Sequence, residues 1–140
     1  MERIPDHVKR YVEGELREYR TLKAELEQLK QDKADIYNRF NQPKGEPVKG
    51  SHPGDPTSAA AILLERNSQR TAAIEHRLKR MEAGLRVCTT KERKLIETKY
   101  FNETEPSDDE VMGYLKIYRK NFYNIKFSAI GRIARVMGIF

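Results

Sequence analysis

The residues best suited to recognition chemistry lie close together near the C-terminus of this 140-residue chain. Arg119 and Lys120 carry cationic groups that can bind phosphate or guanine. The amide of Asn124 can pair with adenine, while Tyr123 can reach a phosphate or pack on the methyl group of thymine. Lys126 continues this polar face one turn later. These residue types at helical spacing predict contact with nucleic acid.

The net charge of the chain is confined to the same region. From Met112 onward there are six basic residues and no acidic one. The other 21 basic residues balance all 21 acidic residues, so the whole net charge of +6 belongs to the last fifth of the chain. A field this localised attracts a polyanion to one place. The alternative is an ordinary basic helix with a solvated face.

Short helices are expected to position these side chains. Thr89 with Glu92 and Ser107 with Glu110 each form a capping-box pattern that predicts a helix start. A final helix is expected after a turn of only three or four residues. Its buried face is predicted from helical spacing to contain Phe122, Ile125, Ala129, Ile130 and Ile133.

The N-terminal part predicts two long amphipathic helices. One apolar stripe runs from Val8 to Phe40 through Glu15 and Lys33, and a second runs from Ala60 to Cys88 through Asn67 and Thr71. Residues 41–57 contain four of the six prolines and predict a loop.

The two stripes are expected to bury each other, either as an antiparallel hairpin within one chain or between two chains of a homodimer. A hairpin that turns near residue 49 places Gly14 beside Gly84 and Lys33 beside Glu65. The predicted fold is therefore all-α, with a helical hairpin over 1–88 and a small DNA-binding domain over 89–140.

Composition argues against several other classes of protein. A single cysteine, Cys88, excludes an internal disulfide and fits a reducing cytoplasm. No 18-residue apolar run occurs, so no membrane association is expected. His7, His52 and His76 are scattered, and no phosphate-binding glycine loop or nucleophile motif is present. We therefore expect no metal, no cofactor and no enzymatic activity.

A short helix, a tight turn and a basic helix form the layout of a helix-turn-helix. Residues 107–133, SDDEVMGYLKIYRKNFYNIKFSAIGRI, resemble without a gap the helix-turn-helix of region four of bacterial sigma factors. Residues 89–103, TTKERKLIETKYFNE, resemble the preceding helix, and more closely the corresponding run in phage late-transcription activators of the RinA and ArpU type. The sequence departs from the family at Met112, at Lys116 in place of a frequent turn glycine, and at Tyr118 in place of a hydroxyl N-cap.

This resemblance implies DNA contacts by Arg119, Lys120, Tyr123 and Asn124, with Lys126 toward the DNA backbone. It implies a cytoplasmic phage or prophage regulator, an activator of late genes, with double-stranded DNA and the host RNA polymerase as partners. A phage small terminase subunit is the main alternative, since it also combines a helix-turn-helix with coiled-coil helices. A helical protein that binds polymerase or a sigma factor without touching DNA is a third.

Overall fold

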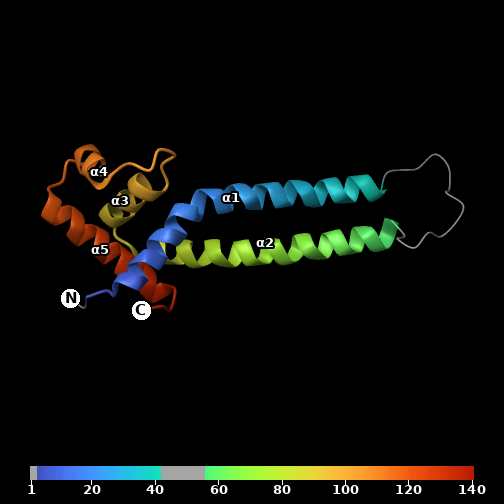
Figure 1. Cartoon of the computed structure of the whole chain (residues 1–140), viewed down its shortest axis with the longest axis horizontal. Coiled ribbons are helices and arrows are strands. Elements are labelled where there is room, and N and C mark those ends of the chain that lie inside the picture. Colours follow the sequence, from blue (N-terminus) through green and yellow to red (C-terminus); the bar gives the residue numbers. More distant parts are fainter. Residues whose placement is uncertain (1–2, 42–55) are drawn as a thin grey trace, which may run out of the picture. The chain divides into compact units, whose positions relative to one another are not determined.

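The computed structural model describes residues 3–41 and 56–140, and within them every regular element is a helix. The predicted all-α fold is therefore confirmed, and most of the predicted loop, residues 42–55, lies outside the described residues. The described residues form five helices, labelled in Figure 1: α1 (Asp6–Asn41), α2 (Pro56–Val87), α3 (Thr90–Tyr100), α4 (Asp108–Leu115) and α5 (Arg119–Val136).

The chain divides into two compact units. One contains residues 1–21 and 77–140, and the other contains residues 22–76. We call them the five-helix unit and the two-helix unit. The division falls inside α1 and α2 and not at the predicted boundary between residues 88 and 89, because the first turns of α1 and the last turns of α2 pack with α3 and α5.

In the two-helix unit, the segments of α1 and α2 lie antiparallel to each other (Figure 1). Asn67 occupies a buried position, where its side-chain amide donates a hydrogen bond of 2.8 Å to the carbonyl of Leu29. The predicted register places Asn67 opposite residue 31, two residues from the observed partner. This contact joins two helices of the same chain.

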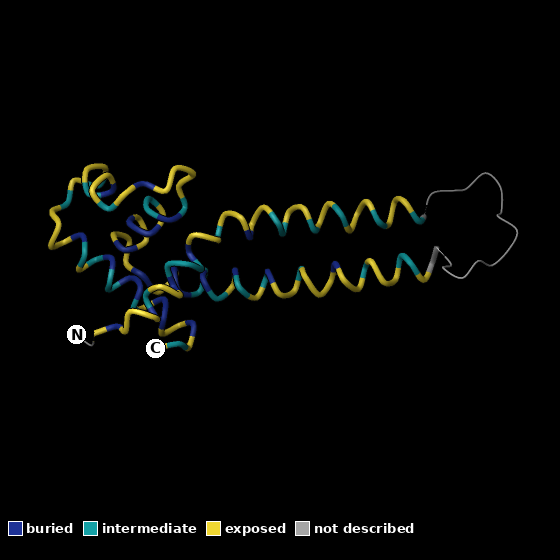
Figure 2. The backbone as a smooth tube through the Cα atoms, in the orientation of Figure 1, coloured by how far each residue is buried: buried dark blue, intermediate teal, exposed yellow. Residues whose placement is uncertain are grey.

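Most of the buried surface belongs to the five-helix unit, whereas exposed residues cover much of the two-helix unit (Figure 2). The nine largest side chains with less than 2% exposure all lie in the five-helix unit: Phe122, Leu16, Met81, Leu95, Ile96, Ile130, Ile133, Val12 and Val111. Both ends of the chain thus contribute to one core.

Gly84 lies at a close approach between α2 and α5. A Cβ atom at this position would lie 3.0 Å from Cγ2 and 3.1 Å from Cα of Ile133. A Cβ atom on Gly14 would meet nothing within 4 Å. Gly84 therefore serves the crossing with α5, and the predicted pairing of Gly14 with Gly84 stays a prediction.

Candidate nucleic-acid interface

Local sequence signals fix the starts of α3 and α4. Thr89 and Glu92 form a reciprocal capping box at α3, and Ser107 and Glu110 form another at α4. In each, the hydroxyl accepts a hydrogen bond of 3.2 Å from the backbone N–H three residues later. Both predicted capping boxes are confirmed, and they satisfy backbone donors that the helix itself leaves unpaired.

Three residues separate α4 from α5, as the sequence predicted. Lys116 ends α4 in a left-handed conformation, with φ 55° and ψ 48°. This region favours glycine, because a Cβ atom there crowds the carbonyl oxygen. Tyr118 precedes α5 without a side-chain capping hydrogen bond, as expected for an aromatic residue, and its side chain is 84% exposed.

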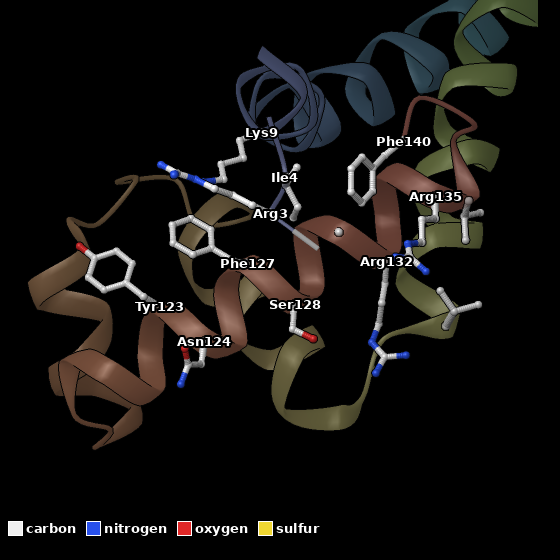
Figure 3. A pocket seen from close by; sticks show the side chains of 13 residues that line it. Arg3, Ile4, Lys9, Tyr123, Asn124, Phe127, Ser128, Arg132, Arg135 and Phe140 are labelled. Atoms are coloured by element: carbon white, nitrogen blue, oxygen red, sulfur yellow. The ribbon is translucent and has the colours of Figure 1, made fainter. Parts of the chain in front are cut away.

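One face of α5 carries polar side chains over most of the helix; Ser128 on this face is half-buried, and Val136 at the end of α5 is exposed. Its residues follow at spacings of three, four, four and three, which places them on one side of a helix: Asn121, Asn124, Ser128, Arg132 and Arg135. Asn124, Ser128 and Arg132 extend from the same side of α5 in Figure 3. Lys120 is exposed beside this stripe, and α5 contains no acidic residue at all.

The predicted contact residues divide between two surroundings. Arg119, Lys120 and Asn124 are exposed, while Tyr123 is half-buried. Arg119 lies near Tyr123, with its guanidinium carbon 5.9 Å from the centre of that ring. Because Asn124 follows Arg119 by five residues, the two point to different sides of α5. Lys120 and Asn124, four residues apart, share a side.

Lys126 is buried, with 7% of its surface exposed. Its ammonium lies 3.6 Å from Oδ2 of Asp108, and the hydroxyl of Tyr123 donates a hydrogen bond of 3.1 Å to the same oxygen. The ammonium of Lys99 lies 3.2 Å from Oδ1. This placement speaks against the predicted role of Lys126 at the DNA backbone, because its charge is already used to hold α4 against α5.

The same contacts determine the acidity of Asp108. Partial burial acts to raise the pKa of its carboxyl group. The charges of Lys126 and Lys99 and the hydrogen bonds from Lys99 and Tyr123 outweigh burial, so the pKa lies below the ordinary value of 3.8. Asp108 therefore stays ionised at neutral pH and links α3, α4 and α5.

A groove of about 680 Å³ runs along α5, and residues from the start of the chain line it together with α5 (Figure 3). Arg3 and Lys9 come from the start of the chain, and Arg132 and Arg135 come from α5. None of the described residues that line it is acidic. No local sequence pattern connects residue 3 to residue 132, so this groove was not predicted.

Within the described ranges, no three His, Cys, Asp or Glu side chains form a group that could hold a metal ion. Cys88 is buried, and burial raises the pKa of its thiol to about 11. Such a thiol is a poor nucleophile at neutral pH.

Over residues 3–41 and 56–140, no helix has both the length and the apolar character needed to cross a membrane.

Comparisons of the chain with models of protein families, with curated proteins and with solved structures find no match.

Proposed function

We propose that α4 and α5 form a helix-turn-helix that binds double-stranded DNA, and that the protein regulates transcription. One observation carries this proposal. The exposed face of an 18-residue helix displays amide, hydroxyl and cationic side chains, and the helix has no carboxylate. Polar groups of this kind are those that contact base edges and phosphates in the major groove.

The exposed residues divide into two roles in this proposal. Asn124 and Lys120 lie in the first turns of α5, where a recognition helix meets base edges, so we assign base contacts to them. Arg119 is assigned to a phosphate near the start of the helix. Asn121 and Ser128 share the exposed stripe with Asn124 and are added to the predicted set, from which Lys126 is removed.

Two resemblances support a more specific proposal: that of residues 89–103 to phage late-transcription activators and that of residues 107–133 to region four of sigma factors. In that proposal the protein activates late genes of a phage or prophage in the cytoplasm of the bacterial host, with the host RNA polymerase as partner. Homodimerisation through exposed parts of the N-terminal helices belongs to the same proposal.

Footprinting of the protein on DNA of its parent genome tests the DNA-binding function. We expect protection of a discrete site, and reporter transcription from that site should rise when the protein is present. Asn124→Ala should weaken binding to the protected site by about 1–3 kcal/mol while leaving binding to random DNA nearly unchanged.

Arg70→Ala provides a matched control, since Arg70 is exposed in the two-helix unit and lies outside the proposed interface. It should bind the protected site as the unaltered protein does. Absence of binding to any DNA at low salt would reject the proposed function.

A further inference from the structure

The groove along α5 adjoins the face proposed to read bases. Tyr123 and Asn124 line one part of the groove, and Asn124 also belongs to the exposed stripe of α5. A duplex held against that stripe therefore brings its backbone to the groove. We propose that the groove is a track for the phosphates of one DNA strand, and that Arg3 and Lys9 at the start of the chain are DNA-contacting residues. This inference rests on the proposed function and extends it.

The charge of the groove matches a linear polyanion. Its four cationic residues come from two separate parts of the chain: Arg3 and Lys9 from the N-terminal segment, and Arg132 and Arg135 from α5. The α5 side extends from Asn124 to Arg135, a length of about 16 Å at 1.5 Å per residue. Phosphates follow one another every 3.4 Å of duplex axis on each strand, so such a length passes several of them. A single small anion does not need cations spread over this distance.

The floor of the groove is partly apolar. Ile4, Phe127 and Phe140 line it, and Lys9 lies 4.3 Å from the centre of the Phe127 ring. A nucleic-acid strand alternates charged phosphates with less polar sugars, so a lining that contains both cations and apolar side chains fits its surface. Arg135 also lies near an aromatic ring, with its guanidinium carbon 5.5 Å from the centre of Phe140.

The N-terminal segment is fixed beside α5 by close packing. Ile4 is buried, and a Cβ atom on Gly131 would lie 3.0 Å from its Cδ1 atom. The absence of a side chain at residue 131 therefore lets Ile4 reach the α5 backbone, and this contact holds the neighbouring cations along the groove.

The ion pairs of two groove cations differ in exposure. Lys9 faces Asp6 at 3.8 Å, near the limit of an ion pair, and the Asp6 side chain is 78% exposed, so this pair contributes little stability and leaves Lys9 able to bind phosphate. Arg132 lies 3.2 Å from the carboxylate of Glu92, whose side chain is buried. Arg132 therefore stays paired with Glu92, and the test is placed on Arg3 and Lys9.

The test uses the full chain and a 30-base-pair duplex of random sequence, with binding measured over a range of salt concentrations. The double variant Arg3→Gln/Lys9→Gln removes two cations of the groove. It leaves Arg132 in place, so the carboxylate of Glu92 keeps its ion pair. Loss of two phosphate contacts should lower the magnitude of the slope of log K against log salt by about 2. The control Arg66→Gln/Arg70→Gln, on the exposed surface of the two-helix unit, should keep the unaltered slope.

The outcomes separate this inference from the proposed function. If the unaltered protein binds the duplex and the Arg3/Lys9 variant keeps its slope, the phosphate track is wrong and the helix-turn-helix proposal stands. If the unaltered protein does not bind at all, the proposed function itself fails. A rise in melting temperature with 1 mM ATP that the double variant abolishes, with no change in its salt slope, would identify a small-anion site and overturn the inference.

Thermal unfolding of each variant provides the check on folding. If Arg3→Gln/Lys9→Gln unfolds at the temperature of the binding assay, Arg135→Gln replaces it as a single change on the opposite rim. The expected loss of slope is then about 1, and an unchanged slope would contradict the inference equally.

Discussion

At the scale of single residues, the turn between α4 and α5 places a lysine in a backbone conformation that favours glycine. Lys116 adopts a left-handed conformation that costs a residue with a Cβ atom about 1–2 kcal/mol. The turn nevertheless closes with the usual helix-ending hydrogen bond, from the backbone N–H of Lys116 to the carbonyl of Met112. Lys116 therefore occupies a turn position whose backbone conformation glycine would adopt at lower cost.

Lys116→Gly should accordingly raise the free energy of unfolding by about 1 kcal/mol, because glycine adopts this conformation without steric cost. Urea titration followed by circular dichroism measures the change. Lys79→Gly is the control, since Lys79 is exposed in the interior of α2, where glycine should lower stability by about 1 kcal/mol. Equal destabilisation by both substitutions would show that the turn does not need a left-handed residue.

Asp108→Asn should lower the free energy of unfolding by about 2–4 kcal/mol, since it leaves the buried ammonium of Lys126 without its counter-charge. Asp109→Asn is the matched control: Asp109 is exposed in the same helical turn. Thermal or urea unfolding at pH 7 compares the two variants.

The pH dependence follows from the same carboxylate. The pKa of Asp108 is lower in the folded chain than its ordinary value of 3.8. Its stabilising contribution is therefore complete above pH 3.8 and is lost as the pH falls below that value. Asp108→Asn should flatten this acid limb of the stability curve. An unchanged limb would mean that other carboxylates dominate acid unfolding.

At the scale of elements, the crossing of α2 and α5 depends on Gly84. Gly84→Ala should lower stability by about 1–3 kcal/mol, because the added methyl group meets the backbone of Ile133 and forces the helices apart. Gly14→Ala should instead raise stability by about 0.5–1 kcal/mol, since Gly14 lies inside α1 with open space around its Cα. Calorimetric unfolding compares the two, and a stabilising Gly84→Ala would contradict this account of the crossing.

Helical periodicity predicted the second stripe well. All nine of its positions are buried or half-buried: Ala60, Leu64, Asn67, Thr71, Ile74, Leu78, Met81, Leu85 and Cys88. The first stripe is less complete: it omits Leu16, which is fully buried, and includes Lys33, which is exposed. A heptad stripe describes one partner helix, whereas the start of α1 packs in a core built from several helices. Periodicity alone could not show that the start of α1 is buried on a second side by further helices.

The candidate nucleic-acid interface was also only partly predictable from the sequence. The polar pattern of α5 predicted the exposure of Asn124, Lys120 and Arg119. The same pattern would also have predicted the stripe through Asn121 and Ser128. The burial of Lys126 could not, because its counter-charge, Asp108, belongs to another helix and is eighteen residues away. For Lys126 the tertiary ion pair overrides the local expectation that a lysine is solvated.

At the scale of the whole molecule, the two compact units predict which parts fold together. Residues 1–21 and 77–140 share one core. Arg77 forms ion pairs with Glu15 and Glu18, so the two ends created by removing residues 22–76 lie near each other. Replacing that segment with a short Gly/Ser linker should keep cooperative unfolding.

The isolated segment 89–140 should not unfold cooperatively, since it loses the packing of Val12, Leu16 and Met81. Calorimetry of the linked chain and of the segment gives the comparison. A segment 89–140 as stable as the full chain would restore the boundary that the sequence predicted at residue 88.

The central claim is that the exposed face of α5 contacts duplex DNA, and chemical-shift mapping tests it most directly. With the ¹⁵N-labelled chain and a random-sequence duplex at low salt, the account predicts shifts of the backbone amides of Lys120 and Ser128 and of the side-chain amides of Asn121 and Asn124. The side-chain amide of Gln69, exposed in the two-helix unit, should not shift. Shifts confined to the two-helix unit, with α5 unchanged at saturating DNA, would contradict the account.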